Sequence, residues 1–474
     1  MNKRYIIVLL LSSIAFPTFA WNWWPLPMAN PDTCQDHLYG VGEISSVFSS
    51  GNTSPYFIRA NQYGNISAEP MSGNISLGII KPATRPCRWF DYDFGLVLTG
   101  RVQGNPQLHT VSGTGYFREF YAHVRLYIID ITAGIHPVHY GVGNEQLSSG
   151  SWIVSSNAHP IPRITVGIDN WTAFPGLFGY AEIKGGVSVG ILSDHNPYVT
   201  HTKWHHLFAG LQLGGKLPIN VSYELHHAAQ WGGYSAKYGD LSNNLSALFN
   251  VMLGRSGGST ANEQMNAQGN HIISQILKLT AKGESWRVET YWQNMNEDGG
   301  FRFIGTGQNK ADFLLGIHMA QTRWRFISGL TYEYIRTTNQ SGVYHDKDGL
   351  AFGGNDNYYN NKIYAQGWTY FGNIIGSPLL TPDNNRVCAH FVGIKGDIFG
   401  FQYRALYNHA ENYGTYNTPH RSYNNGMLVE VFKQVPKCWN IEFGLSLAGD
   451  WGTQYGNHFG AQITIRKKGL ILTY

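Results

Sequence analysis

Apolar and polar residues alternate along this sequence in repeated segments of about ten residues. In SWRVETYWQNM, Trp286, Val288, Thr290 and Trp292 fall on one face of an extended chain, and Glu289 falls on the other. A period of two is the pattern of a β-strand with one apolar face. A tilted strand of about ten residues is also long enough to cross the hydrocarbon of a membrane.

The same alternation recurs along the chain. The segments PINVSYELHHA, WNIEFGLSLAG, GFQYRALYNHA and YFREFYAHVRLY each place apolar side chains on one face and polar ones on the other. Similar runs number about sixteen to eighteen, joined by short and long links in turn, as in porins. The chain therefore predicts an all-β protein, a transmembrane antiparallel β-barrel with long extracellular loops.

The first twenty residues predict export. Asn2, Lys3 and Arg4 precede an apolar run, and Thr18-Phe19-Ala20 supplies a cleavage site, so residues 1–20 read as a signal peptide and residues 21–474 as the barrel. The apolar run is shorter than the about 20 residues of a spanning helix. Only 14% of the residues are charged, against about 25% in soluble domains. The predicted location is the outer membrane of a Gram-negative bacterium, in contact with its lipid.

The last segment, HFGAQITIRKKGLILTY, also alternates. Phe459, Ala461, Ile463 and Ile465 share the outward face, and the sequence ends on the aromatic Tyr474. A last strand with a terminal aromatic residue predicts recognition by the outer-membrane assembly machinery.

Function is expected in four long connections, near residues 136–160, 231–269, 297–310 and 337–387, because loops on a rigid scaffold commonly carry binding residues. The second predicts a short helix. Leu245, Leu248, Phe249 and Met252 recur at helical spacing, with Ser242 or Asp240 expected as the N-cap and Gly254 as the end.

Four sequence elements occur in the order and spacing of a known family. QWGG (230–233), EQMNAQGNHIIS (263–274), YWQNMNEDG (291–299) and GIHPVHYGVGNEQLSSGSW (134–152) resemble the capsule assembly Wzi family. The resemblance covers most of the chain after residue 115. It implies an outer-membrane barrel that acts as a lectin and holds capsular or related polysaccharide at the cell surface.

Polysaccharide recognition requires aromatic rings for the apolar faces of sugars, with polar or charged groups for hydroxyls and uronates. For Trp231, burial beneath the loop is favoured over ligand contact, because a large aromatic beside Gly-Gly commonly anchors packing. The net charge of +4 favours an anionic polymer. The candidate binding residues are Trp152, Trp231, Tyr234, Tyr238, Tyr358, Tyr359, Lys362 and Trp368.

Charges of both signs are predicted in the lumen. Mixed charges can pair into a lattice that closes the interior, whereas selective channels present a biased ring. This favours a closed barrel, and a general or substrate-selective porin is the alternative. The predicted lumenal charges are Glu119, Arg125, Glu224, Arg287, Glu289, Arg325, Glu333, Arg404 and Glu442.

No catalytic, metal or cofactor site is predicted. The adjacent pairs His205-His206 and His226-His227 point to opposite strand faces and cannot converge on one centre. The compartment excludes nucleic acid as a partner. Cys34, Cys87, Cys388 and Cys438 allow three pairings into two disulfides. We favour Cys34 with Cys87 and Cys388 with Cys438, over a zinc site.

Overall fold

A computed structural model describes residues 36–83, 89–260, 267–297, 309–343, 345–347 and 350–473. The predicted signal peptide, Cys34, Cys87, Tyr474 and most of the predicted loop 297–310 lie outside these residues. Among the described residues, no helix has the length and apolar character needed to cross a membrane.

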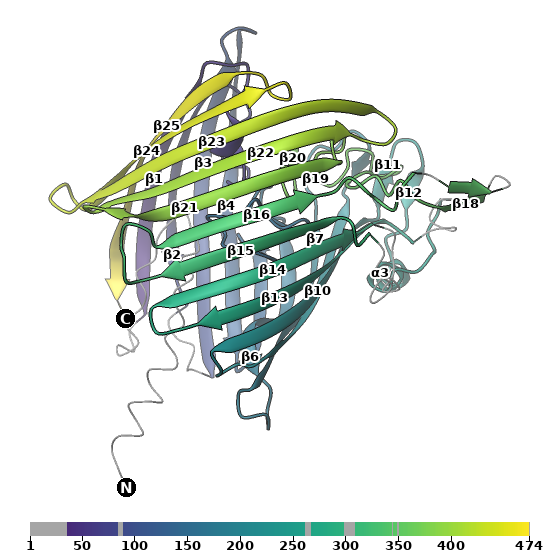
Figure 1. The fold of residues 1–474 in the computed structure, drawn as a ribbon, viewed down its shortest axis with the longest axis horizontal. Helices are drawn as coiled ribbons and strands as arrows, with labels where there is room; N and C mark the ends of the chain where they lie inside the picture. Colours follow the sequence, from purple (N-terminus) through teal and green to yellow (C-terminus); the bar gives the residue numbers. More distant parts are fainter. Residues whose placement is uncertain are drawn as a thin grey trace.

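Within the described residues, eighteen strands form one antiparallel sheet. This sheet closes into a barrel (Figure 1). The first and last strands pair from His37 with Thr473 to Ser49 with Gly460, which leaves the sheet without an edge. The wall strands are β1 (His37–Ser49), β2 (Met71–Lys81), β3 (Phe90–Asn105), β4 (Thr110–Leu126), β5 (Ile129–Ile135), β6 (Arg163–Ala173), β7 (Ala181–Ile191), β9 (Lys203–Leu213), β10 (Ile219–Trp231), β13 (Asn270–Lys282), β14 (Trp286–Asn296), β15 (Phe313–Gln321), β16 (Gly329–Arg336), β21 (Val387–Ile398), β22 (Phe401–Gly414), β23 (Pro419–Val435), β24 (Ile441–Gly452) and β25 (His458–Thr473).

Short elements lie in the loops. The described residues contain two helices, α2 (Tyr56–Arg59) in the connection β1–β2 and α3 (Leu245–Met252) in the connection β10–β13. One small sheet contains β8 (Val199–Thr200), β11 (Gly233–Ser235) and β12 (Gly239–Leu241). Two hairpins, β17 (His345–Lys347) with β18 (Leu350–Gly353) and β19 (Thr369–Tyr370) with β20 (Asn373–Ile374), lie between β16 and β21.

The predicted alternation is confirmed in the wall. In β10 the side chains of Ile219 and Val221 are exposed on the outer face, whereas Asn220, Ser222 and Glu224 are buried inside. Outward apolar side chains suit lipid, and inward polar ones suit a lumen.

The wall contains one informative irregularity. In the pairing of β3 with β4, Val97 faces Glu119 and Leu98 faces Phe117, so Arg118 is an extra residue in a β-bulge. Because of the bulge, the consecutive side chains of Arg118 and Glu119 are both buried.

The lumenal prediction for Arg325 is wrong. β15 ends at Gln321, and Arg325 lies exposed in the turn that leads to β16. The Gln321 side chain stabilises this turn, because its Oε1 accepts a hydrogen bond from the backbone N–H of Trp324 at 2.8 Å. The alternation therefore stops four residues before Arg325.

The two ends of the barrel differ. Connections such as 127–128, 283–285 and 399–400 make short turns at one end, and the long loops all emerge at the other. In outer-membrane barrels the short turns face the periplasm and the long loops face outside.

The favoured pairing of Cys388 with Cys438 is wrong, since neither cysteine forms a disulfide within the described residues. Cys388 stands at the loop end of β21, whereas Cys438 lies in the short turn between β23 and β24. The length of the wall separates them, far beyond the about 7 Å between Cα atoms that a disulfide tolerates.

Candidate functional site: a plugged mouth and an exposed aromatic patch

Three loops fold back into the extracellular half of the lumen and form a plug, which we define as residues 50–70, 136–162 and 354–386. The largest apolar cluster of the described residues joins side chains of these loops to inward-facing wall residues. The hydrophobic core of the protein therefore lies inside the extracellular half of the barrel. Plug members of the cluster are Tyr56, Phe57, Ile58, Ala60, Ile66, Val142, Leu147, Trp152, Ile153, Ala158, Ile161, Tyr358, Tyr359, Trp368, Tyr370, Ile374, Ile375, Leu379 and Leu380.

Polar residues on the inner face of the wall fix the plug in place. The carboxylate of Glu333, fully buried on β16, accepts hydrogen bonds from Ser148 Oγ at 2.7 Å, Ser149 N at 2.8 Å and Tyr291 Oη at 2.6 Å. Lys395 Nζ donates to Gln146 Oε1 at 2.7 Å. These contacts satisfy loop groups that would otherwise be buried without partners.

The plug loops also bind one another. Trp368 Nε1 donates to the Ile153 carbonyl at 2.8 Å, and Ser155 N donates to the Ile375 carbonyl at 2.8 Å. Gly64 N donates to the Asn157 carbonyl at 2.9 Å. Since each loop bonds to another, the plug forms one unit.

Two histidines mark the ends of the middle plug loop. Desolvation, with Arg163 as a second cause, lowers the pKa of His136 to about 3. Desolvation and the nearby Arg101 lower the pKa of His159 to about 4. Both rings are therefore neutral at neutral pH while the plug is in place.

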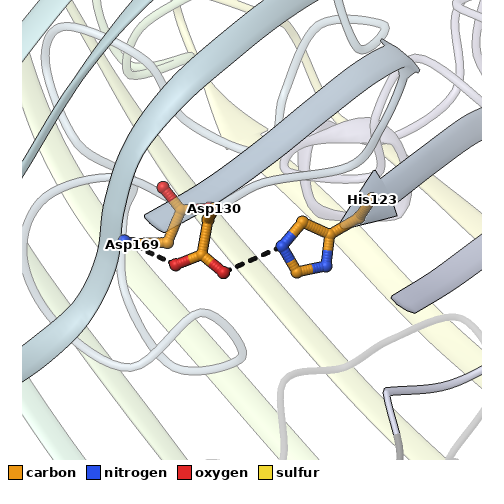
Figure 2. A group of neighbouring side chains, drawn as sticks. All are labelled: His123, Asp130 and Asp169. Carbon is orange, nitrogen blue, oxygen red and sulfur yellow. Dashed lines mark hydrogen bonds and ion pairs between the residues drawn. The ribbon is translucent and has the colours of Figure 1, made fainter. Parts of the chain in front are cut away.

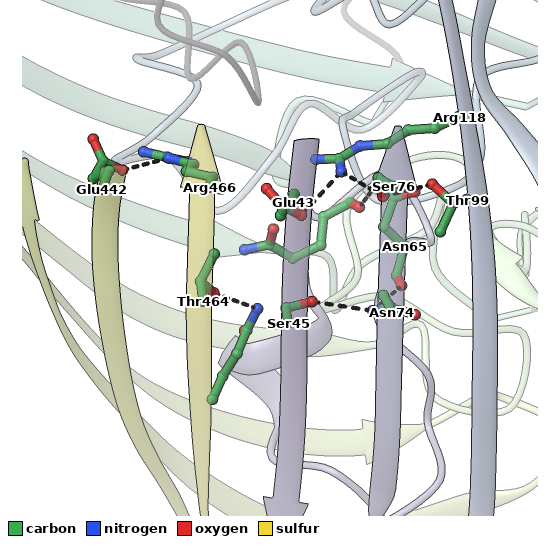
Figure 3. A network of polar contacts seen from close by, with 12 residues as sticks. Glu43, Ser45, Asn65, Asn74, Ser76, Thr99, Arg118, Glu442, Thr464 and Arg466 are labelled. Carbon is green, nitrogen blue, oxygen red and sulfur yellow. Dashed lines mark hydrogen bonds and ion pairs between the residues drawn. The ribbon is translucent and has the colours of Figure 1, made fainter. Parts of the chain in front are cut away.

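Below the plug the lumen is lined by paired charges (Figure 3). Arg118 lies 3.0 Å from Glu43, and Arg466 pairs with Glu442. Glu43 and Arg466 also line a small pocket together with Gln62 of the plug. Ion pairing of opposite charges matches the lattice predicted from the sequence. Of the predicted lumenal charges, Glu119, Glu224, Glu289, Glu333 and Arg404 are buried, and Arg125, Arg287 and Glu442 are half-buried.

A cluster near the periplasmic end brings together His123, Asp130 and Asp169 (Figure 2), whose ligand atoms lie within 4.8 Å of one another. Asp130 Oδ1 already lies 2.9 Å from His123 Nε2 and 2.7 Å from Arg125 Nε, and its Oδ2 accepts from Asp169 N at 3.1 Å. The other ring nitrogen of His123 faces Asp93. With a cationic Arg125 in contact, this arrangement is an ion-pair cluster.

The structure divides the eight predicted binding residues into two groups. Five of them are buried. Four of these lie in the plug, namely Trp152, Tyr358, Tyr359 and Trp368, and the fifth, Trp231, lies beneath the loop that follows β10. Tyr234 is 50% exposed, Tyr238 is 38% exposed and Lys362 is exposed. Burial of Trp231 agrees with the reading favoured from the sequence.

The exposed group surrounds the small sheet of β8, β11 and β12. Tyr234 is the cross-strand partner of both Thr200 and Asp240, so the three side chains share its exposed face. Lys237 Nζ lies 5.1 Å from the centre of the Tyr238 ring. We define Tyr198, Tyr234, Lys237, Tyr238 and Asp240 as the aromatic patch.

A buried cluster holds the patch rigid. Val199, Leu241, Ile363 and Tyr364 pack together, and Tyr364 Oη donates to the Gly232 carbonyl at 3.1 Å. Lys362, adjacent in sequence to Ile363, is thereby kept near this sheet.

Sequence reasoning missed Tyr198, which is 50% exposed. Asn196 Oδ1 accepts a hydrogen bond from Tyr198 N at 2.8 Å and so fixes the turn. The turn-forming pair Asn196-Pro197 between two alternating segments was the available signal.

Comparison with known proteins shows the fold. No family model and no curated protein sequence matches the chain. Among solved structures, the chain is similar to Wzi, an outer-membrane protein involved in group 1 capsule assembly in Escherichia coli and a carbohydrate-binding β-barrel, with a TM-score of 0.57 and 15% identity over 90% of this chain and 84% of that one. Pseudomonas aeruginosa OccK7 (OpdD) follows with a TM-score of 0.48 and 10% identity over 92% of this chain and 100% of that one. The chain therefore has the fold of Wzi, and it is an outer-membrane β-barrel of a Gram-negative bacterium.

Proposed function

We propose that this barrel binds an exported polysaccharide, capsular or related, and holds the polymer at the cell surface through the aromatic patch. The observation that carries the proposal is the contrast between a mouth filled by the plug and exposed rings on a braced sheet above it. A filled lumen argues against free passage of solutes, and a rigid exposed aromatic surface suits a large ligand that stays outside.

The patch offers the chemistry that a sugar polymer requires. The rings of Tyr234 and Tyr238 can stack on the apolar faces of pyranose rings. Asp240 and Thr200 flank Tyr234 and can hydrogen-bond to hydroxyl groups. The ammonium group of Lys237 suits a uronate or another anionic substituent. Carbohydrate binding by Wzi, which has the same fold, further supports the proposal.

The first experiment is on the producing bacterium. Deletion of the gene is expected to leave total polysaccharide unchanged while moving polymer from the cells to the medium. An unchanged partition would count against attachment. In that case conductance in planar bilayers would test the porin alternative.

The second experiment locates the site. The double variant Tyr234→Ala, Tyr238→Ala is expected to shed polymer as the deletion does, while keeping wild-type levels of folded protein in the membrane. Tyr180→Ala is the matched control, because Tyr180 is 52% exposed at the opposite, periplasmic end. Retention of polymer by the double variant would move the site away from the patch.

A further inference from the structure

The outer face of β10 changes character along the strand. At the periplasmic end, Ile219 is 60% and Val221 44% exposed, as lipid-facing side chains are. Towards the loop end, His227, Ala229 and Trp231 lie on the same outward face by strand parity, yet each is at most 2% exposed. Something covers this part of the outer wall.

The cover is the loop that follows β10, and we name its described residues 232–260 the outer clasp. Ala247 and Val251 of α3 are buried against Ala229 and Trp231 of the wall, with Leu248 partly buried beside them. Figure 1 shows α3 outside the barrel, beside β11 and β12. The clasp thus folds outwards, over wall that would otherwise face the membrane.

The covered wall also holds three histidines. His205, His227 and His271, from β9, β10 and β13, are buried there, and His227 Nε2 lies 2.8 Å from His271 Nδ1. His206 and His226, the sequence neighbours of His205 and His227, point into the lumen, as predicted from strand parity. The clasp therefore shields polar rings from the membrane.

The far side of α3 is apolar and open. Leu245 is 74%, Phe249 59% and Leu253 47% exposed, and these residues recur every four positions along one face. At about 100° per residue, Phe249 points about 160° away from Ala247 and Val251. No charged residue occurs from position 241 to position 254. The helix is thus apolar towards the wall and apolar away from it.

We propose that Leu245, Phe249 and Leu253 bind lipid of the outer leaflet, at the boundary between the acyl chains and the headgroups. The stripe continues the lipid-facing wall below it, since the same outer face of β10 is exposed and apolar at Ile219 and Val221. An exposed Arg255 follows the helix, where a cation can meet lipid phosphates.

Lipid fits this surface better than a second copy of the chain. A stable dimer interface buries about 800 Å² on each partner, far more than three side chains of a short helix provide. A membrane needs no such area, because the wall already holds the barrel in the bilayer. The lipid contact does not depend on the proposed polysaccharide binding.

The test places a photo-crosslinking residue, p-benzoylphenylalanine, at one position at a time. The full-length protein is reconstituted in vesicles of phosphatidylethanolamine, phosphatidylglycerol and lipid A, which carries no polysaccharide chain. Position 249 is compared with Ile317, a lipid-facing wall residue that is 44% exposed, and with Tyr234 of the aromatic patch. An aromatic residue replaces Phe249, so the substitution preserves the packing of the helix.

We expect the yield of lipid adduct at position 249 to be comparable with that at position 317. At position 234 we expect no lipid adduct. The proposal would be overturned by a yield at 249 as low as that at 234, or by an adduct with the mass of two protein chains, which would identify a second copy as the occupant. Polysaccharide is absent from this assay, so its outcome is separate from that of the attachment experiment.

Discussion

The plug is formed by three extracellular loops that fold into the barrel, whereas the outer clasp is one extracellular loop that folds over its outside. The plug packs apolar side chains against inward-facing wall residues, and the wall side chains of Glu333 and Lys395 also hydrogen-bond to it. The clasp packs Ala247 and Val251 against Ala229 and Trp231 of the outer wall. Both regions therefore bury apolar side chains, and the plug is in addition fixed by hydrogen bonds to polar groups of the wall.

The largest expected effect comes from removing the wall anchor of the plug with Glu333→Ala. The substitution removes the acceptor of three hydrogen bonds, which are donated by Ser148 Oγ, Ser149 N and Tyr291 Oη. Hydrogen bonds to a charged group contribute about 1.5–3 kcal/mol each, so we expect several kcal/mol less stability of the inserted plug. Conductance steps in planar bilayers and faster hydrogen exchange in residues 136–162 measure the loss.

The matched control for this variant is Glu182→Ala. Glu182 is also a wall carboxylate, but it lies at the periplasmic end of β7 and accepts a hydrogen bond from Gln212. We expect no conductance and no change in the plug. Equal conductance of the two variants would show that the substitutions weaken the barrel as a whole.

Trp231→Ala should release α3 of the outer clasp while the plug stays inserted. Trp231 is 2% exposed where it packs on α3, and truncation of a buried tryptophan costs about 3–5 kcal/mol. Hydrogen exchange should rise most in residues 245–252, with no conductance, because Glu333 still anchors the plug. Trp324→Ala, at a 59% exposed tryptophan in a periplasmic turn, is the control. Conductance of Trp231→Ala would show that the clasp also holds the plug, through the packing of Leu241 on Ile363 and Tyr364.

The wall could be predicted from the sequence because strand parity is local. Alternation assigned the lumenal faces of β10 and β14 correctly and failed for Arg325, where the strand had already ended. The plug could not be predicted in the same way. Its contacts join residues far apart in the chain, such as Trp368 and Ile153, which are separated by 215 positions.

The candidate site shows the same limit. An aromatic residue beside glycine or asparagine reads alike whether it fills a plug, as Tyr358 and Tyr359 do, or stands in solvent, as Tyr234 does. Only the fold separates these cases. The short helix was predicted within its loop and its end near Gly254 was correct, but its N-cap is Asn244 and neither Ser242 nor Asp240.

A smaller effect is expected from removing that N-cap with Asn244→Ala. Asn244 Oδ1 accepts a hydrogen bond from Ala247 N at 2.8 Å, and loss of such a cap costs about 1 kcal/mol. Hydrogen exchange should rise within α3 and less than in Trp231→Ala. Ser246→Ala, an exposed substitution in the first turn of the helix, should leave exchange unchanged. An equal rise in both variants would rule out capping as the cause.

The smallest expected effect is a pH dependence confined to the plug. The pKa of His159 is about 4 with the plug inserted and returns to about 6.5 if the loop is released to water. Between these values the released loop binds more protons, so the inserted state loses stability as the pH falls from about 6.5 towards about 4. His136, whose pKa is lowered to about 3, acts in the same direction.

Buried carboxylates oppose this trend, so a variant is needed to isolate the histidine. Burial raises the pKa of Asp312 and of Asp356, and their inserted forms therefore take up protons more readily than the released forms as the pH falls. His159→Phe keeps a ring between Tyr116 and Phe371, whose ring centres lie 4.8 Å and 5.4 Å from that of His159, but it removes the proton site. Hydrogen exchange in residues 136–162 should accelerate less on acidification in the variant than in the wild type, while exchange in the clasp is unchanged by the substitution. Identical acceleration in both proteins would assign the pH dependence to other groups, such as His136 or Asp356.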